Sequence, residues 1–438
     1  MGLFNKLQAV INERYSLTRA LVLSLVIKLS IFVVGIAIIG VFSGRTELSS
    51  CGAAFSGSPS VYYSPYSDLE AYTDYRDLYL RCLVTPFLNG ASAYNLPIVY
   101  NYPPLFLYTL SAFALANIIW LPAIPLVLTD ALTVIPIYLI VRDYLSDGNS
   151  KLAFAVSLAW IVNPLNLFYN DLMWLNPGPT TFFLVTSIYL LLRGNYVFSS
   201  IALAISTGFK QVSVLIFPIL LLFSIRVRGF TRDLLYYAMI YVGLLFLISL
   251  PYIYENPQQY LWALQLPILG NPPGTGSGNP TTFVYDLSQP VRLTTFLGLV
   301  KFVDLRAIAV QSYSVLDFVV IAAYAGIIVY MLIWRRPAAN DLVVYCLAAL
   351  LVFDAFFGRG VYKYYFAALT PLAMPFLSSR RGLIIFQGFS VALILLPRVV
   401  SPWMAVLLLT FLPSVVSQEK ENLPPSDVGG HELGPSQS

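Results

Sequence analysis

Apolar runs long enough to cross a lipid bilayer recur along the whole chain, and they leave few other folds open to it. A spanning helix needs about 20 mostly apolar residues, and residues 19–43 supply the first such run. Of the 438 residues, 58% are hydrophobic and 15% aromatic, and the mean hydropathy is +0.75. A water-soluble domain cannot hide that much apolar surface from solvent. We therefore expect a polytopic membrane protein.

Basic residues between the apolar runs predict the orientation, because short loops rich in Lys and Arg stay on the cytoplasmic side. Lys6, Arg14 and Arg19 precede the first run, which lacks a signal-peptide cleavage site and is interpreted as a retained anchor. If residues 104–120 form an interfacial or re-entrant helix instead of a span, the later basic positions also lie inside. These positions are Arg142, Lys151, Arg193, Arg226, Arg228, Arg232, Arg335, Arg336, Arg380 and Arg381.

This pattern predicts an all-α polytopic membrane protein with about twelve transmembrane helices and with interfacial helices in a large first external loop. The expected spans are residues 19–43, 121–142, 152–169, 179–193, 196–209, 211–226, 233–254, 313–334, 339–356, 362–378, 382–398 and 402–416. A location in the cell membrane with both termini cytoplasmic follows from this topology.

The same topology divides the chain into regions. Residues 1–18 are expected to be a cytoplasmic amphipathic N-terminus, 19–416 the integral-membrane domain, and 417–438 a polar, disordered cytoplasmic tail. External loops cover residues 44–120 and 255–312. The second loop contains 270-GNPPGTGSGNP-280, which cannot form a regular element. This loop is either a lid over a site or a connector.

Composition excludes several chemistries. The net charge of +4 is small and the basic residues are dispersed, so a nucleic-acid partner is not expected. The only histidine, His431, lies in the tail, which removes His-dependent triads and His metal sites from the membrane domain. Cys51 and Cys82 share the first loop and either form a disulfide or remain two thiols, and with Cys346 they have no metal-ligand spacing. No cofactor or metal is expected.

Four carboxylates gather in the first external loop, in 67-SDLEAYTDYRDLYLRC-82. Ser67 and Glu70 match a helix capping box. Apolar positions then recur every three or four residues, which predicts a helix lying along the membrane surface. The carboxylates are Asp68, Glu70, Asp74 and Asp77.

Asp74 is the strongest candidate base among these acids. Asp77 lies four residues before Arg81 and can pair with it. Asp74 has no basic residue at that spacing, and Glu70 lies one turn before it. A carboxylate without a partner just outside a membrane is a candidate general base. The alternative is that the acids only solvate an interfacial helix.

Three basic residues are predicted at the outer ends of spans, where the charge rule disfavours them. They are Lys210 in 208-GFKQVSV-214, and Arg359 and Lys363 in 357-FGRGVYKYYFAALTP-371. A lipid phosphate at the outer interface would explain all three, and snorkelling to headgroups is the alternative.

The order of segments resembles the integral-membrane GT-C glycosyltransferases that use polyprenyl-phosphate or dolichyl-phosphate sugars. The resemblance rests on an acid-bearing loop helix ending in 90-GASAY-94, then on 101-NYPPLFLY-108, 126-LVLTDALTVIPIYLIVRDYL-145, 163-NPLNLFYNDLMWLNPG-178 and 209-FKQVSVLIFPILLLF-223. It covers about residues 19–225 and is fainter at 357–377. The chain lacks the Trp-Trp-Asp-Tyr-Gly sequence and the soluble domain of the oligosaccharyltransferase branch.

The resemblance implies an external active site with a catalytic Asp in the first loop. Asp74 lies sixteen residues before Gly90, close to the family spacing, and Asp68 is the competitor. Lys210, Arg359 and Lys363 would bind the donor phosphate. The other expected substrate-binding residues are Tyr102, Pro103, Pro104, Asp77 and Tyr362.

The implied reaction moves one hexose, mannose in preference to glucose, from the lipid-phosphate carrier to a lipid-linked or surface glycan acceptor. The expected partners are this donor, the acceptor and membrane lipids. Two other functions stay open at this point. A lipid or solute transporter would place polar groups near the bilayer midplane, but Asp130, Asp317 and Asp354 are interpreted as near span ends. A non-catalytic scaffold leaves the clustered acids unexplained.

The topology is tested by the accessibility of single cysteines in a cysteine-free background. Cysteines placed at Ser92 and Asn279 are expected to react with an impermeant thiol reagent from outside, because both positions lie in the external loops. A cysteine at Asn149 is expected to react only after the membrane is permeabilised. Labelling of position 149 from outside would reverse the assignment of sidedness.

Overall fold

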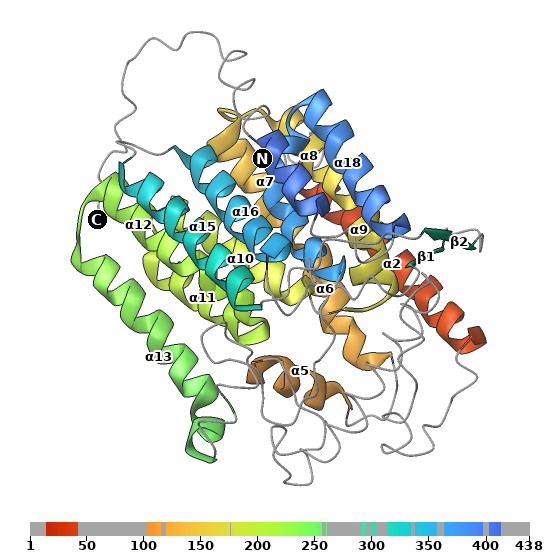
Figure 1. Ribbon diagram of the computed structural model, residues 1–438, viewed down its shortest axis with the longest axis horizontal. Helices are drawn as coiled ribbons and strands as arrows, with labels where there is room; N and C mark the ends of the chain where they lie inside the picture. The colour runs from red at the N-terminus through yellow and green to blue at the C-terminus, as the bar shows by residue number, and fades with distance from the viewer. Residues whose placement is uncertain are drawn as a thin grey trace, which may run out of the picture.

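The computed structural model describes residues 15–42, 103–114, 120–175, 177–255, 260, 291–294, 300–303, 313–333, 338–356, 363–396 and 403–412. Nearly all of these residues are helical, and most of the helices run alongside one another in one bundle (Figure 1). The exception is an antiparallel pair of strands, β1 (Val291–Thr294) and β2 (Val300–Val303), in which Val291 lies opposite Val303. The predicted all-α polytopic class is confirmed, with this strand pair as a small departure.

The first half of the described chain forms helices that are often short or irregular. The α-helices are α2 (Leu17–Phe42), α5 (Pro104–Ala114), α6 (Ile124–Leu132), α7 (Val134–Ile140), α8 (Ser150–Ile161), α9 (Pro164–Asn166), α10 (Pro177–Leu192) and α11 (Tyr196–Phe209). A 3₁₀ turn, η4 (Leu121–Ala123), precedes α6. Two π-helical segments, η5 (Val141–Leu145) and η6 (Leu167–Leu172), follow α7 and α9.

The second half contains longer helices and one long 3₁₀ segment. The α-helices are α12 (Ile216–Arg228), α13 (Arg232–Glu255), α15 (Tyr313–Ile333), α16 (Ala339–Phe356), α17 (Met374–Leu377), α18 (Arg380–Leu395) and the helix Trp403–Leu412. The 3₁₀ segments are η7 (Gln211–Leu215) and η9 (Lys363–Ala373). The predicted spans 196–209 and 339–356 coincide with α11 and α16, whereas 362–378 is η9 followed by α17 instead of one regular helix.

Within the described residues, four helices are long and apolar enough to cross a membrane: Leu17–Ala37, Ile124–Leu145, Gln211–Arg228 and Arg232–Tyr254. The pair Ser150–Ile161 and Pro164–Leu172 makes a fifth if it is one span bent by 41°. Shorter apolar helices are Pro177–Leu192, Tyr196–Phe209, Val319–Ile333 and Trp403–Leu412. The protein is therefore a multi-pass membrane protein, in which several of the twelve expected spans are shorter or broken.

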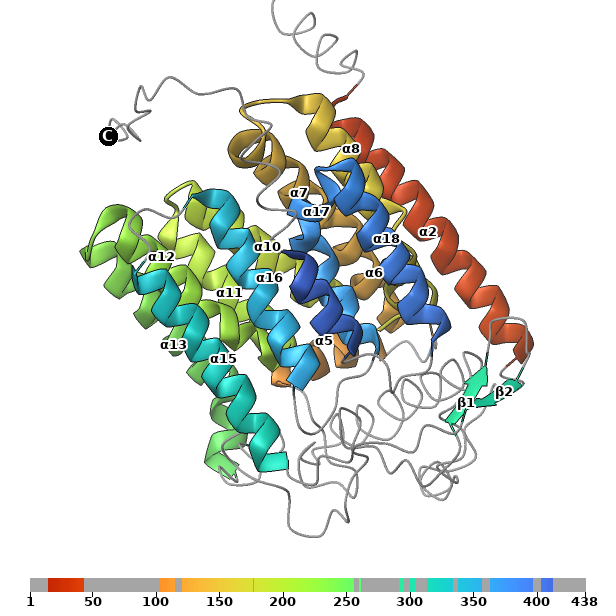
Figure 2. The same cartoon turned by 45° about the horizontal axis from the view of Figure 1, so that its top comes forward.

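α5 has 11 residues and forms the first part of the segment predicted not to cross the membrane. That segment extends beyond the described residues, so its failure to span stays a prediction. α5 lies across one end of the bundle (Figure 1). The opposite end, uppermost in Figure 2, carries the first residues of α2, α8 and α18 and the loop between α12 and α13. These described helix ends therefore lie at one end of the bundle, and the side of the membrane that this end faces stays a prediction.

Asparagine, proline and glycine residues determine where several of these helices begin and end. Asn149 accepts hydrogen bonds from the backbone N–H groups of Lys151 (3.1 Å) and Leu152 (3.2 Å) and so caps α8. At Asn163 the span breaks, because Pro164 cannot continue the backbone ladder of α8 and the Asn163 side chain caps α9 instead. Gly229 ends α12 with φ of 77°, a conformation that favours glycine.

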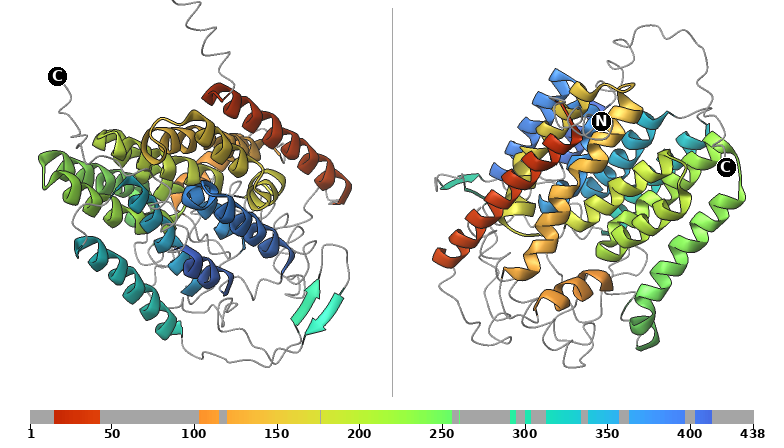
Figure 3. Two further views of the ribbon diagram at one scale, coloured as in Figure 1. Left: turned by 90° about the horizontal axis from the view of Figure 1, so that it is seen from above. Right: turned by 180° about the vertical axis from the view of Figure 1, so that it is seen from behind.

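The two edge helices expose apolar faces. α2 and α13 lie at opposite edges of the bundle (Figure 3). Along α13, side chains that are more than half exposed recur at helical spacing, at Leu235, Met239, Val242 and Phe246. A surface of this kind suits lipid tails instead of water. The inner face of α13 packs on α11 and also contacts α12, where the ring of Tyr241 stacks on that of Phe217 at 4.3 Å between centroids.

Candidate functional site

Six of the ten predicted site residues lie outside the described residues, and the predictions for them stay predictions. They are Asp68, Asp74, Asp77, Tyr102, Arg359 and Tyr362. The structure describes the other four, Pro103, Pro104, Lys210 and Lys363, and all four are buried.

The structure brings Pro104 and Lys210 into the same region. Pro104 is the first residue of α5, and α5 packs against α11. The contact lies at Gly208, where a Cβ atom would come within 3.2 Å of the Leu105 side chain. A Cβ at position 208 would require the Leu105 side chain to shift by a few tenths of an ångström, so the glycine suits this close approach. Gly208 lies two residues before Lys210, which places the Pro-Pro turn beside the end of α11.

Lys210 lies at a break between two helical segments. α11 ends at Phe209, and Lys210 adopts an extended conformation (φ −152°, ψ 122°) before η7 begins. Its side chain is 1% exposed. A break of this kind inside a membrane bundle is tolerated where the freed backbone is buried in protein or faces a site.

Two tyrosines from η9 cover the Lys210 ammonium. Nζ lies 3.4 Å from the ring centroid of Tyr365 and 4.7 Å from that of Tyr364. Nζ has no hydrogen-bond partner in the described part of the chain. Cation–π contacts offset part of the cost of burying an ammonium, but its three N–H donors still favour an acceptor. The arrangement is therefore suited to binding an anion.

Lys363 occupies the first position of η9, immediately before these tyrosines. It is buried, and its Nζ donates a hydrogen bond of 3.2 Å to the carbonyl oxygen of Ile394 in α18. Two of the three basic residues predicted to bind the donor phosphate are thus attached to neighbouring elements.

Asp354 is a buried carboxylate that the sequence analysis did not assign to the site. It lies near the end of α16, is 2% exposed, and its Oδ2 has no hydrogen-bond partner among the described residues. α16 packs against η7, which follows Lys210 in the chain, and against η9, whose tyrosines cover the Lys210 ammonium. Asp354 does lie near a span end, as the sequence predicts, but its side chain is buried in protein.

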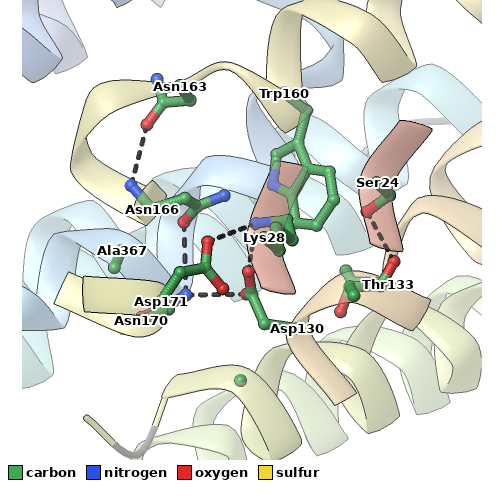
Figure 4. Close-up of polar contacts among 12 residues, drawn as sticks. Ser24, Lys28, Asp130, Thr133, Trp160, Asn163, Asn166, Asn170, Asp171 and Ala367 are labelled. Carbon is green, nitrogen blue, oxygen red and sulfur yellow. Dashed lines mark hydrogen bonds and ion pairs between the residues drawn. The ribbon is translucent and has the colours of Figure 1, made fainter. Parts of the chain in front are cut away.

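A second buried polar centre joins three elements that are distant in sequence (Figure 4). Lys28 of α2 forms ion pairs with Asp130 of α6 and with Asp171 of η6, the latter at 3.0 Å between Nζ and Oδ2. Asn170 Nδ2 donates to Asp130 Oδ1 at 2.7 Å. The Lys28 ammonium also lies 4.5 Å from the ring centroid of Trp160. We call Lys28, Asp130, Asn170 and Asp171 the Lys28 centre.

Trp160, whose ring lies beside the Lys28 ammonium, connects this centre to η9. With its amide oxygen facing Trp160, the Asn166 side chain accepts from the indole Nε1 at 2.7 Å and donates to Thr370 Oγ1 at 2.7 Å. Thr370 in turn donates to the carbonyl oxygen of Ala367 at 2.9 Å. Because Thr370 and Ala367 belong to η9, the network links the Lys28 centre to the segment that carries Tyr364 and Tyr365.

Local backbone features allow the Lys28 centre to form. η6 is π-helical, and such segments are rare and frequently occur at special sites. Gly178 lets the first turn of α10 approach Asp130, because a Cβ there would lie 3.2 Å from the Asp130 Cβ. Gly35 lets α2 approach the end of η6, where a Cβ would lie 2.7 Å from the carbonyl oxygen of Leu172.

The sequence analysis missed the Lys28 centre, although one signal was present. Lys28 stands inside the apolar run 19–43, and an ionisable residue in a span is expected to have a partner. Asp130 was interpreted as near a span end, but it is fully buried inside the span Ile124–Leu145. No group of three or more His, Cys, Asp or Glu side chains suited to a metal ion occurs in the described part of the chain.

A comparison with protein-family models finds that residues 70–270 match the family of the GPI transamidase subunit PIG-U. The matched range is a little under half of the chain and contains both Asp74 and Lys210. No curated protein matches the sequence. The chain is thus similar to a family of membrane proteins with a role in GPI-related machinery, and no comparison supports a transporter.

The Lys28 centre yields a prediction about stability. Lys28→Met leaves two carboxylates buried without their cation, and breaking a buried ion pair in this way costs roughly 3–5 kcal/mol. We expect a large loss of folded protein in detergent, measured by fluorescence-detected size exclusion and thermal unfolding. Lys151→Met is the matched control, because Lys151 is exposed. Equal thermal stability of the two variants would contradict the structural role of Lys28.

Proposed function

We propose that this membrane protein binds a polyprenyl-phosphate or dolichyl-phosphate sugar and transfers its hexose to a lipid-linked or surface glycan on the external face. Mannose is proposed in preference to glucose. The observation that carries the proposal is Lys210, a buried ammonium without a hydrogen-bond acceptor in the described part of the chain, held at a helix break beside α5. A lipid phosphate at the membrane interface supplies the anion that this geometry favours.

The family match supports a glycolipid substrate. It includes the acid-bearing loop and Lys210 in one continuous range. GPI is a glycosylated phospholipid, so a relative named for GPI chemistry is consistent with recognition of a sugar and a phosphate together. The acceptor, the linkage and the carrier lipid belong to the proposal as classes of compound.

The proposed reaction is a direct displacement at the anomeric carbon. An acceptor hydroxyl oxygen attacks that carbon, its proton passes to Asp74, and the bond from the carbon to the phosphate oxygen breaks. The electron pair of that bond stays on the lipid phosphate. Lys210, Arg359 and Lys363 stabilise the charge that grows there, because fixed cations act strongly in a site of low dielectric.

A second candidate function rests on the family name itself. The matched family is a subunit of a transamidase, so the chain is alternatively a non-catalytic subunit that holds a glycolipid for partner proteins. The two candidates share the lipid-phosphate site at Lys210 and differ in whether this chain carries out a reaction.

The decisive experiment uses the purified chain in lipid nanodiscs with a radiolabelled polyprenyl-phosphate hexose and a lipid-linked glycan acceptor. Transfer of label by the chain alone supports the glycosyltransferase. Binding of the donor without transfer, together with stoichiometric co-purification of other proteins from the native membrane, supports the subunit. Absence of donor binding contradicts both.

Donor binding makes the first mutational prediction. Lys210→Met removes a charge-assisted contact to phosphate, worth roughly 1.5–3 kcal/mol, so donor affinity is expected to fall by about 10- to 150-fold. Arg359→Ala is expected to act in the same direction. Lys151→Met removes an exposed positive charge and serves as the control. An equal, small effect of all three substitutions in a donor-binding assay would leave no role for Lys210.

The acidic loop makes the second mutational prediction. General base catalysis contributes about 10²–10⁴-fold to a rate, and an amide cannot accept the proton. Asp74→Asn is therefore expected to abolish transfer while donor binding is retained, and Asp68→Asn to be the next most damaging. Glu70→Gln and Asp77→Asn are expected to be mild. Full transfer activity in both Asp74→Asn and Asp68→Asn would remove the base from this loop.

A further inference from the structure

Two ionisable groups of opposite type are buried on neighbouring elements without forming an ion pair. Lys210 Nζ and Asp354 Oδ2 each lack a hydrogen-bond partner among the described residues. The two side chains are 1% and 2% exposed, and α16, which carries Asp354, packs against η7, which follows Lys210, and against η9, whose tyrosines cover the Lys210 ammonium. We call these residues the Lys210–Asp354 pair.

The Lys28 centre shows what a closed buried pair looks like in the same protein. There the ammonium contacts both carboxylates directly. Desolvating a charge costs several kcal/mol unless hydrogen bonds or an opposite charge compensate it. Because the Lys210–Asp354 pair is not in contact, its two ends are suited to a polar group that lies between them and satisfies both.

The chemistry of the two ends defines that group. An ammonium donates hydrogen bonds and favours an anionic oxygen, whereas a carboxylate accepts them and favours a hydroxyl. A phosphate attached to a sugar carries both functions on one molecule. The Tyr365 ring covers one side of the ammonium at 3.4 Å from its centroid, while Lys210 Nζ and Asp354 Oδ2 both keep hydrogen-bonding capacity that no described residue uses.

We propose that Asp354 is the sugar-recognition residue of this site and accepts a hydrogen bond from a hydroxyl of the hexose whose phosphate is bound by Lys210. This inference rests on the proposed function and deepens it, since it assigns the phosphate and the sugar to separate side chains. Asp354 acts on specificity: it makes the site discriminate a glycosylated lipid phosphate from the bare lipid phosphate that is left after transfer.

The test compares two ligands in nanodiscs, polyprenyl-phosphate hexose and polyprenyl phosphate without sugar, on four forms of the full chain. Lys210→Met is expected to weaken both ligands. Asp354→Asn is expected to weaken the glycosylated lipid by about 10- to 150-fold, the effect of losing a hydrogen bond to a charged group. The same variant should bind the bare lipid phosphate as well as the wild type or more tightly, because a negative charge has been removed.

Asp341→Asn is the matched control, because Asp341 lies in the first turn of α16, at the opposite end from Asp354. It is expected to leave the affinities for both ligands unchanged. Thermal unfolding of each variant reports whether the fold survives. If Asp354→Asn does not fold, the wild type is titrated with deoxy-hexose donors that each lack one hydroxyl. One of these analogues is then expected to bind as weakly as predicted for Asp354→Asn.

Each other outcome overturns a defined part of the argument. Equal weakening of both ligands by Asp354→Asn would show that Asp354 only positions Lys210 and would overturn the inference. In that case the Lys210→Met/Asp354→Asn double variant is expected to regain the thermal stability that each single variant loses. Equal affinity of the wild type for every deoxy analogue would also overturn the inference. If the wild type binds neither lipid, the proposed function fails first, and the two failures are thereby distinguished.

Discussion

An ammonium group buried inside a membrane bundle needs compensation for the water it loses, and Lys28 obtains it from two carboxylates whose positions constrain the packing of the amino-terminal half of this protein. Its two carboxylate partners lie 102 and 143 residues further along the chain. α2 therefore cannot pack as an independent apolar rod, because it must present Lys28 where α6 and η6 present their acids. The glycines at 35 and 178 supply the close backbone approach that this contact needs, and Ser24 adds a 2.8 Å bond to the Ala131 carbonyl oxygen.

Irregular backbone is concentrated where the buried polar side chains are. The break at Asn163 and the π-helical η6 lead to Asn170 and Asp171, and the break after α11 exposes Lys210 to η9. Regular membrane helices satisfy their own backbone groups and gain nothing from such breaks. Here the breaks turn polar side chains toward one another. The backbone hydrogen bonds lost at a break are partly replaced by caps such as the Asn163 side chain, and the polar side chains are satisfied by hydrogen bonds such as that from Asn166 to Thr370.

The two polar centres of the bundle differ in which groups compensate the buried lysine ammonium. Lys28 contacts two carboxylates and an aromatic ring, as expected of an ion pair that stabilises the fold. The Lys210 ammonium lies against two tyrosine rings and has no hydrogen-bond partner among the described residues, and the same is true of Asp354 Oδ2 as regards hydrogen bonds. η9 connects the two centres through Thr370 and Tyr364, so the Lys28 centre also helps to position the segment that covers Lys210. Function is therefore sought at the centre whose charges remain unmatched.

The sequence alone determined the membrane class and most helix positions, and it singled out Lys210 and Lys363 as candidate phosphate-binding residues. It could do so because hydropathy and local charge are properties of each segment by itself. The predicted spans 196–209 and 339–356 coincide with α11 and α16 for this reason. Only the tertiary structure decided which charges meet. Asp130 and Asp354 were expected at span ends, and both are buried. The environment of a buried charge depends on which helix faces adjoin it, and those faces come from segments more than a hundred residues apart, so no local pattern records the pairing of Lys28 or the separation of Lys210 from Asp354.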